Sequence, residues 1–348
     1  MPAHPSNYLS AATAEILRSY ATEAERLGQL HPAQLEIIYE KKWFLLLAST
    51  SCGGAGANLP EALRLLEALA WADGSCGWTV TLCSGAGWFT GFMEPAIGKN
   101  LLADPKACLA GSGQSTAIAR VTKQGWEVSG HWNFASGAPH ASHFTFNARV
   151  ERDGKILQND RGEDLLLTAW VPRSQVLVLH SWQAMGMVAT ASHSFELEKL
   201  PVSAEQCFTL DPAYAVDRGP LYQFPFQQLA ETTIAVNLAG MAQRFLELAA
   251  PVKEGIEKKT NALQQLQDWR LALYALAEKS WHQLEQGHPI PADILQAISY
   301  SARRLGNGAH SLVNEVFPFC GLLAANRNTE INRVWRNLNT AALHSVLH

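Results

Sequence analysis

The chain has 348 residues, of which 47% are hydrophobic and 17% are charged, and its formal net charge is −4. This length allows two or three packed units with a substantial core, and the hydrophobic fraction excludes an intrinsically disordered chain. The near balance of charge leaves no basic footprint for nucleic acid, and the low charged fraction favours a homo-oligomer in which part of the surface is covered.

Three features bear on where the protein works. The longest strongly apolar run, residues 43–48, is too short to cross a bilayer. The N-terminus, MPAHPSNYLSAATAEI, lacks the basic and apolar regions of a signal peptide. We therefore expect a cytoplasmic protein with no membrane contact. The cysteines contain no C-x-x-C pair, which is typical of reduced thiols and not of a disulfide framework or a zinc site, so we expect no metal. The six cysteines are Cys52, Cys76, Cys83, Cys108, Cys207 and Cys320.

The first hundred residues show helical periodicity. Apolar residues at helical spacing in residues 13–27 and 35–46 predict two amphipathic helices, and the glycine-rich break SCGGAGANLP precedes a third helix that begins near Pro60. Residues 76–93 carry aromatic side chains and almost no charge. This segment is either a helix buried on most sides or a helix that faces a ligand cavity, and for any single aromatic the plain core is the simpler interpretation.

The period changes to that of strands after Pro95. Residues 121–132 alternate around a turn at Lys123-Gln124-Gly125, and residues 144–150 run into Asp153-Gly154, a hairpin signal. Residues 165–171 and 194–200 continue the strand pattern. A helical period returns at residues 229–248 and recurs in 263–284, 291–316 and 332–347.

These patterns predict an α+β chain in three domains. An N-terminal helical domain spans residues 1–102, a middle antiparallel β-domain spans 103–215, and a C-terminal four-helix bundle spans 216–348.

Two glycine-rich segments invite a nucleotide-binding interpretation. GGAG at 53–56 lacks the G-x-G-x-x-G spacing, a preceding strand and a P-loop lysine, so it predicts a flexible turn. Gly111-Ser112-Gly113 also lacks the third glycine. Its amides, Ser112 and the following Ser115 and Thr116 are suited to the edge of a phosphate or flavin ring, but a β-turn explains them equally well.

Neither a G-x-S-x-G elbow nor a histidine beside an obvious nucleophile is present, so the sequence does not favour a hydrolase. His344 follows Arg333 and Arg336 near the end of the last predicted helix. A histidine there is often only a cation that the helix dipole favours.

Three ordered segments resemble the acyl-CoA dehydrogenase fold superfamily across nearly the whole chain. They are CGGAGANLPEALRLLEALAWADGSCGW, GWEVSGHWNFASGAPHASH and WQAMGMVATASHSFELEKLPV, which match the A-D-x-S-x-G-W, V-S-G-x-W-x-F-x-S-G and W-x-x-x-G-M-x-x-T-x-S patterns of that superfamily. The resemblance implies the helix, strand, helix order described above.

The C-terminus separates two branches of the superfamily. Dehydrogenases carry a base glutamate before the last helix, and Asn326 stands at that position here; an amide cannot abstract a proton. The oxygenase components of two-component flavin monooxygenases, the p-hydroxyphenylacetate hydroxylase-like branch, end in R-x-x-R-D and a later histidine. Arg333, Arg336 and His344 match this ending, with Asn337 in place of the aspartate.

The resemblance to this branch implies a cofactor and a site. Reduced FMN or FAD, supplied by a separate flavin reductase, reacts with O2 where water is excluded. Ser136 aligns with the hydroxyl that approaches flavin N5, and His344 with a proton donor or acceptor; these two are the implied catalytic residues. The resemblance also implies cofactor contacts and substrate contacts. The cofactor contacts are Ser112, Gly113, Trp132, Phe134, Ser136 and Arg336, and the substrate contacts are Trp88 and Trp182.

Two family features are missing. The helix TVTLCSGAGWFTGF has no histidine to contact a phenolic substrate, and the R-x-x-F-G pattern that grips FAD of a neighbouring subunit is replaced by KEGIEKKTNALQQLQDW. Transient use of reduced flavin therefore fits better than a permanently bound group.

The leading hypothesis is an oxygenase component acting on a small aromatic or apolar molecule, assembled as a homotetramer or dimer. One alternative is an acyl-CoA dehydrogenase-like flavin oxidoreductase with a displaced base such as Glu330. Another is a flavin-free homologue that acts as a binding or scaffold protein.

Overall fold

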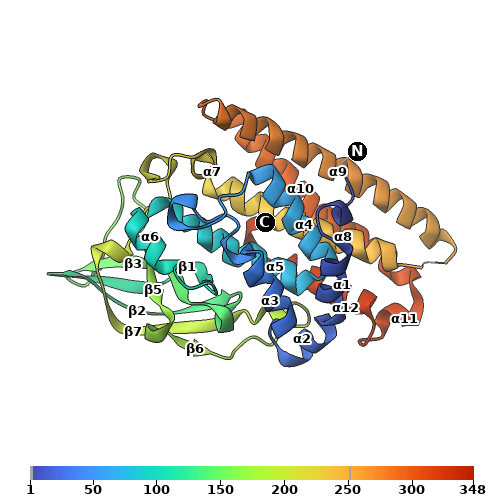
Figure 1. Ribbon diagram of the computed structural model, residues 1–348, viewed down its shortest axis with the longest axis horizontal. Helices are drawn as coiled ribbons and strands as arrows, with labels where there is room; N and C mark the ends of the chain where they lie inside the picture. The colour runs from blue at the N-terminus through green and yellow to red at the C-terminus, as the bar shows by residue number, and fades with distance from the viewer. Residues whose placement is uncertain (1–2, 251) are drawn as a thin grey trace.

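The structure is a computed structural model that describes residues 3–250 and 252–348. Helices precede and follow a single central sheet (Figure 1). The first helices are α1 Ala11–Ser19, α2 Ala21–Leu27, α3 Pro32–Glu40, α4 Leu59–Ala72, α5 Gly74–Trp88 and α6 Pro95–Leu101. The strands are β1 Leu109–Thr122, β2 Gly125–Ala135, β3 His143–Arg152, β4 Lys155–Ile156, β5 Leu166–Pro172, β6 Leu177–Leu179 and β7 His193–Val202. The last helices are α7 Pro220–Gln223, α8 Phe226–Leu248, α9 Glu254–Glu285, α10 Ala292–Val316, α11 Gly321–Ala325 and α12 Glu330–Ala341.

The predicted α+β fold class is confirmed. In the N-terminal part the helices are shorter than predicted. The helix expected over 13–27 is divided at Tyr20, and the helix expected over 35–46 ends at Glu40. Lys42 adopts a left-handed conformation with φ 52°, which stops the helix and starts a 3-10 turn. None of the described helices is both long and apolar enough to span a membrane.

The sheet is mostly antiparallel, as predicted, and one strand pair in it is parallel. Its strand order is β4-β3-β1-β2-β7-β6, with β5 paired to β3, and β1 pairs with β3 in parallel. The reason is the connection after β2, which returns to the start of β1, where the Ser142 amide donates to the Cys108 carbonyl at 2.8 Å. The segment Gly111-Ser112-Gly113 lies within β1 and is not a turn. The domain boundaries at 102/103 and 215/216 stay a prediction.

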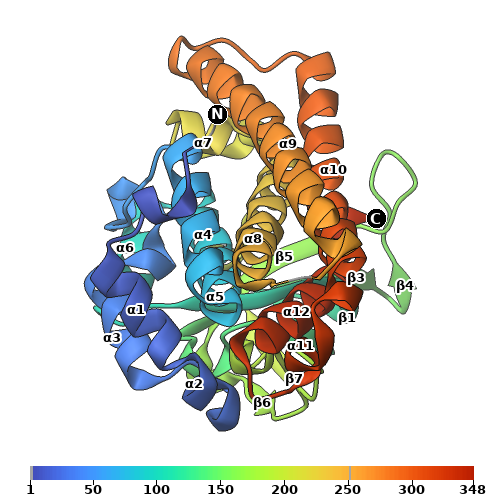
Figure 2. The same ribbon diagram turned by 90° about the vertical axis from the view of Figure 1, so that its right-hand side faces the viewer.

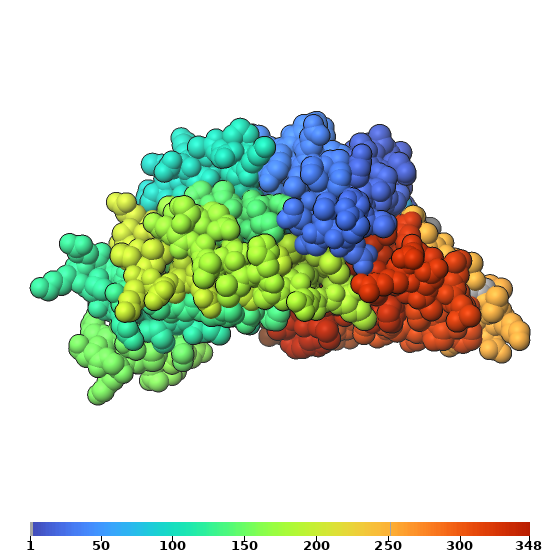
Figure 3. All heavy atoms as spheres, turned by 90° about the horizontal axis from the view of Figure 1, so that it is seen from below, coloured from blue at the N-terminus to red at the C-terminus, as the bar shows by residue number. Residues whose placement is uncertain are grey.

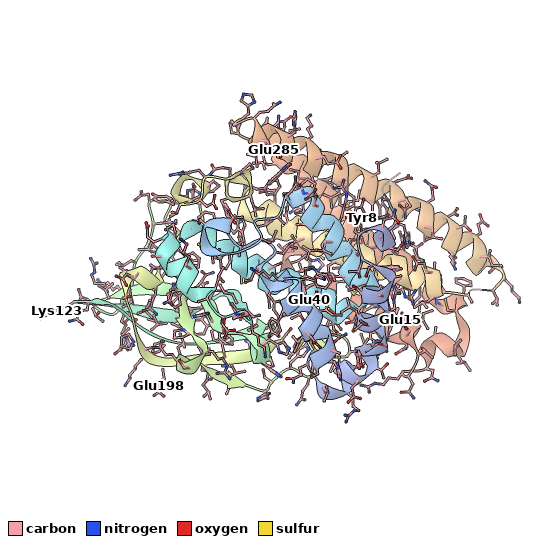
Figure 4. The ribbon with its side chains drawn as sticks, viewed as in Figure 1. Tyr8, Glu15, Glu40, Lys123, Glu198 and Glu285 are labelled. Carbon is pink, nitrogen blue, oxygen red and sulfur yellow. The ribbon has the colours of Figure 1, made fainter. Side chains whose placement is uncertain are left out.

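The sheet has its own aromatic core. Trp132 stacks on Phe195, with ring centroids 4.9 Å apart and planes 10° apart, and it also contacts Phe146. The indole N–H of Trp132 donates to the Asn147 carbonyl at 2.9 Å. The hairpin between β1 and β2 extends beyond this core, and Lys123 lies at its tip, away from the helices (Figure 4).

Helix α5 lies between the sheet and the other helices. Only Leu82 and Gly85 of its 15 residues are not buried. Its neighbours approach very closely, since a Cβ on Gly77 would lie 2.4 Å from the Ala70 backbone nitrogen of α4. Figure 2 shows α4 and α5 beside α8, with the strands of the sheet below them. The glycine-rich, uncharged composition of this segment therefore reflects enclosure by neighbouring elements.

A buried charge pair joins the first helices to the bundle. Glu67 of α4 and Arg270 of α9 are both fully buried, with an Nε to Oε1 distance of 2.5 Å and an Nη2 to Oε2 distance of 2.9 Å. The Tyr274 hydroxyl donates to the same carboxylate at 2.7 Å. Where α8 crosses α4, a Cβ on Gly240 would lie 2.2 Å from the Glu67 carbonyl oxygen, so only glycine fits there.

The two ends of the chain meet on one face. Figure 3 shows the N-terminal helices in contact with the C-terminal segment. Arg336 of α12 forms an ion pair with Glu25 of α2 at 2.6 Å, and Arg333 donates to the Thr22 hydroxyl at 2.8 Å. The last residues also pack inward, because Leu347 is buried and its carbonyl accepts from Asn307 of α10.

Replacing Arg270 with Ala is expected to lower the free energy of unfolding by roughly 3–5 kcal/mol, because Glu67 would stay buried without its charge partner. The matched control is Arg26→Ala, which breaks an exposed pair with Glu23 and is expected to leave stability nearly unchanged. Urea unfolding followed by circular dichroism measures both. Similar small effects in the two variants would show that the buried pair contributes little.

Candidate active site

A cavity of about 160 Å³ lies where α5, α8 and the first residues of β1 and β3 converge. Among the described residues that line it, no side chain carries a charge. Most are apolar, and the polar ones are hydroxyl or amide groups. The lining comprises Leu47, Thr81, Leu82, Gly85, Ala86, Phe89, Ala110, Gly111, Ser112, Gly113, Ser136, Thr145, Phe146, Asn147, Thr168, Leu210, Phe226, Leu229, Ala230, Thr233 and Ile234.

The threonine hydroxyls in this lining already donate their protons within the protein. Thr81 donates to the Gly77 carbonyl at 2.8 Å, and Thr233 donates to the Leu229 carbonyl at 2.8 Å. Thr168 donates to the Asn147 side chain, also at 2.8 Å. The cavity therefore presents apolar surface and hydroxyl lone pairs to a ligand.

Ser136 lies at one end of the cavity, directly after β2. Its hydroxyl accepts a hydrogen bond from the indole N–H of Trp78 at 3.1 Å. The ring of Trp78 in turn contacts His344 edge-on, with centroids 5.7 Å apart and planes 66° apart. The fold thus brings the two predicted catalytic residues, 208 positions apart in sequence, into contact with the same tryptophan.

His344 begins the last turn of the chain. Helix α12 ends at Ala341, earlier than predicted, and His344 caps the 3-10 turn Ser345–Leu347. Its Nδ1 accepts from the Val346 amide at 3.3 Å, which places the proton of the neutral ring on Nε2. Burial lowers the pKa of His344 below its ordinary value. A neutral imidazole with a free Nε2–H therefore stands beside Trp78.

Phe134 presents an exposed aromatic face two residues before Ser136. Its side chain is 63% exposed, and its backbone is held at φ 67°, a conformation that is costly for a residue with a side chain. Trp182 approaches it edge-on, with centroids 6.1 Å apart, and is fixed by donation from its indole N–H to the Met187 carbonyl at 2.8 Å. Together these rings form an apolar surface next to Ser136.

Ser112 and Gly113 line the cavity as residues of β1. The Ser112 hydroxyl accepts from the Gln114 amide at 3.4 Å, and a Cβ built on Gly113 meets nothing within 4 Å. Both positions leave room for a ligand beside the strand, and their role in binding a cofactor stays a prediction.

Four further predicted contact residues do not line this cavity, and their role in binding a cofactor or substrate stays a prediction. Trp132 is enclosed in the aromatic core of the sheet. Trp88 is fully buried between Tyr222 and Phe226, and its neighbour Phe89 lines the cavity instead. The guanidinium of Arg336 is buried and engaged by Glu25 and the Met185 carbonyl. Trp182 is not part of the cavity lining either; it lies beside Phe134.

Trp78 was not among the site residues predicted from the sequence. It ends the A-D-x-S-x-G-W segment, so the motif was visible, but an indole in an apolar helix is ordinarily core. Its hydrogen bond to Ser136 became evident only from the packing of α5 against the loop after β2.

Comparison with known proteins agrees with this architecture. A family model described as acyl-CoA dehydrogenase, C-terminal domain, matches residues 260–348. The flavin-dependent monooxygenase oxygenase subunit HsaA of Rhodococcus jostii strain RHA1 is 22% identical over 94% of this chain and 91% of its own length. The crystal structure of 3-HSA hydroxylase from Rhodococcus sp. RHA1 superposes with a TM-score of 0.90 at 20% identity, covering 99% of this chain and 93% of that one. The chain has the acyl-CoA dehydrogenase fold.

A second solved structure of this fold contains a reduced flavin. XiaF from Streptomyces sp., in complex with FADH2 and glycerol, superposes with a TM-score of 0.87 at 19% identity, covering 99% of this chain and 91% of that one. The resemblance to the acyl-CoA dehydrogenase fold superfamily and to its monooxygenase branch is confirmed.

The base expected of a dehydrogenase is not supplied by the segment before α12. Asn326 is an exposed residue that ends α11, and Glu330 forms an ion pair with Arg244 at 2.7 Å. Neither residue lines the cavity. Among the residues that the structure describes, no carboxylate therefore lines the cavity.

His140, four residues after Ser136, has a buried Nε2 with no hydrogen-bond partner, and burial lowers its pKa to about 4. The unfolded chain takes up a proton near pH 6.5 and the folded chain does not until about pH 4, so stability is present above pH 6.5 and is lost as pH falls between these values. His140→Phe is expected to remove up to about 3 kcal/mol of this pH dependence.

Urea unfolding at pH 7 and pH 4.5 measures the effect. His131→Gln serves as a control of opposite sign. The carboxylate of Glu196 raises the pKa of His131, so the contribution of His131 to stability is present at acid pH and is lost as pH rises. If His140→Phe lost as much stability between pH 7 and pH 4.5 as the parent protein does, burial of His140 would not be the cause of that loss.

Proposed function

We propose that this chain is the oxygenase component of a two-component flavin-dependent monooxygenase. It uses reduced FMN or FAD and O2 to oxygenate a small, uncharged aromatic or apolar molecule. The observation that carries the proposal is the uncharged cavity that ends at Ser136, with Trp78 and His344 behind it. The related oxygenase subunit HsaA and the FADH2 complex of XiaF support it.

The residues around Ser136 fit a flavin ring. The exposed ring of Phe134, with Trp182 packed edge-on against it, offers an apolar face for such a ring, and the hydroxyl of Ser136 offers a hydrogen bond at its edge. When bound in reduced form, the flavin supplies the electrons that activate O2. The absence of the R-x-x-F-G pattern from the sequence supports transient binding and leaves FMN and FAD as equal candidates.

The chain's own residues have three tasks in this reaction. The apolar cavity walls exclude water from the reacting groups, and Ser136 orients the cofactor edge. His344, neutral and in contact with Trp78, is the residue proposed to give or take a proton. The dehydrogenase alternative lacks a base at the cavity, because Glu330 is paired with Arg244.

The lining also limits the substrate. A cavity of about 160 Å³ is comparable to engineered apolar cavities that hold a benzene ring. A carboxylate or phenolate placed there would find no cation and no base, so burying it would be costly. The substrate is therefore a neutral ring compound that is already electron-rich enough to accept oxygen without deprotonation.

A reductase and further copies of the chain complete the proposed system. Leu322, Leu323 and Leu343 are 89%, 70% and 79% exposed in the isolated chain. This exposure supports a homo-oligomer, a tetramer or a dimer, that covers them. All six cysteines are free, which supports work in the reducing cytoplasm.

His344→Gln is expected to lower the rate of oxygen transfer roughly 10²-fold or more with little change in flavin affinity, because the side chain moves a proton and does not hold the cofactor. In the parent protein the rate should fall at acid pH, below the ordinary histidine value of about 6.5, since burial lowers the pKa of His344. The variant should lose this acid limb.

The measurement supplies reduced FMN anaerobically, admits ¹⁸O2 with indole as probe, and follows labelled product and hydrogen peroxide across pH. His348→Gln, four residues later, is the matched control. If the parent protein binds no reduced flavin and forms no labelled product from any neutral ring compound, the proposed function is wrong.

Gly85→Leu is expected to abolish binding of a neutral ring compound without lowering the melting temperature. Gly85 faces the cavity from α5, and a Cβ there meets nothing within 4 Å, so a leucine side chain fills the cavity while removing a helical glycine. Gly85→Ala is the matched control and should still bind.

Isothermal titration with indole and with indole-3-acetate measures the selection for charge. The acid should bind at least about 100-fold more weakly, since its carboxylate has no partner in the cavity. Equal affinity for the two compounds would contradict the uncharged-substrate assignment.

A further inference from the structure

Part of the cavity wall comes from the irregular connector between β7 and α7. Leu210 of this connector lines the cavity, while its neighbours Thr209 and Asp211 are exposed to solvent. Three residues further on, the ring of Tyr214 is 66% exposed. Figure 1 shows the connector at the periphery of the molecule, next to α7. The segment 209–214 therefore covers the cavity with one apolar side chain and turns its other side to water.

The segment 209–214 is hydrogen-bonded within itself and not to the helices or strands around it. The Tyr214 amide donates to the Asp211 carbonyl at 2.8 Å, and the Ala213 amide donates to the Asp211 carboxylate at 2.8 Å. Among the residues that the structure describes, the groups outside the segment that bond to it are the Ala215 amide and the Arg218 guanidinium, both in the same connector. The segment can therefore move as a unit without breaking a hydrogen bond to a helix or strand.

Firm anchors hold the connector on both sides of this segment. Before it, Phe208 is buried and its amide donates to the Thr168 carbonyl of β5 at 3.1 Å. After it, the Asp217 amide donates to the Gly91 carbonyl at 2.9 Å, and the Asp217 carboxylate accepts from the Ser49 hydroxyl at 2.5 Å. A short, self-contained segment between two fixed points is the arrangement of a hinged flap.

Other lining residues outside the regular helices and strands are held more firmly. Leu47 is fully buried, and its carbonyl accepts from the Tyr222 hydroxyl at 3.1 Å. Phe89 packs against the rings of Phe208 and Phe226, with centroids 5.4 and 5.6 Å away. The segment 209–214 is therefore the part of the wall that yields most readily.

This flap lies across the sheet from Ser136. The flap is anchored to β5 through Phe208, whereas Ser136 directly follows β2. The strand order between them is β5-β3-β1-β2, so three strand spacings, about 14 Å, separate β5 from β2. A cofactor bound at Ser136 would therefore leave the flap end of the cavity accessible.

We propose that the segment 209–214 is a flap that admits the substrate, and that Leu210 is a specificity-determining residue at this entrance. The opposing walls belong to the packed helices α5 and α8, so a longer substrate finds room only where Leu210 withdraws. Opening takes a single leucine side chain out of the cavity. The inference rests on the proposed function, because it takes this cavity to be the substrate site.

The first test measures association of the protein with 4-cyanoindole, a neutral fluorescent ring compound, by stopped flow. Leu210→Ala removes the side chain that holds the flap closed, and should raise the association rate constant at least about tenfold. Leu229→Ala makes the same deletion in the cavity wall on α8. It should change affinity through the dissociation rate and leave the association rate constant within about twofold of the parent value.

Size selection gives a second measurement, which a merely structural role of Leu210 would not move. The ratio of affinities for 3-propylindole and indole should rise about tenfold in Leu210→Ala, because the propyl chain takes the place of the deleted side chain. Leu210→Met keeps a long apolar side chain and should retain the parent ratio. Tyr214→Ala removes a ring from the outer side of the flap and should leave both measurements unchanged.

The outcomes distinguish the flap from the function on which it rests. A parent protein that binds no neutral ring compound, with or without reduced FMN, overturns the flap together with the proposed substrate site. If the compounds bind and Leu210→Ala keeps the parent association rate constant, or Leu229→Ala raises it equally, the flap is overturned and the monooxygenase assignment stands. An unchanged affinity ratio in Leu210→Ala overturns the role of Leu210 in specificity.

Discussion

The enclosure of α5 is the constraint on which the site depends. This helix touches α4, α8 and the sheet at once, so each of its faces has a fixed neighbour. Trp78, Thr81 and Gly85 recur at helical spacing, so one face of α5 supplies both the hydrogen bond to Ser136 and part of the cavity lining, while Gly77 packs against the backbone of α4. Because one rigid element makes all three contacts, a change that tilts α5 would alter the cavity and the surroundings of Ser136 together.

Two largely buried ion pairs join distant helices, and none of the described residues that line the cavity is charged. The pair of Glu67 and Arg270 ties α4 to α9, and the pair of Glu25 and Arg336 ties α2 to α12. Each pair joins segments that are more than 200 residues apart. The described residues that line the cavity are uncharged, and in such a medium a hydrogen bond is electrostatically stronger than it is in water.

The order of helices and strands followed from periodicity in the sequence, whereas the direction of side chains did not. Trp132 and Trp88 were correctly expected to lie on apolar elements, but periodicity does not tell whether an aromatic ring faces a core or a cavity. The parallel pairing of β1 with β3 was also missed, because it depends on where the chain returns after β2. Ser136 and His344 were paired through family resemblance, and the structure adds Trp78, which physically connects them.

The most conspicuous departure from the family ending, Asn337 for aspartate, has a structural explanation. The side chain is almost fully buried, and its carbonyl oxygen accepts one hydrogen bond, from the Met187 amide at 2.7 Å. An amide oxygen serves this purpose as well as a carboxylate and avoids burying a charge. Its contact fixes Met187, whose carbonyl accepts from the Thr190 hydroxyl. The substitution therefore preserves the link between α12 and the turn beside Ser136, and with it the arrangement that the tail of the chain imposes on the site.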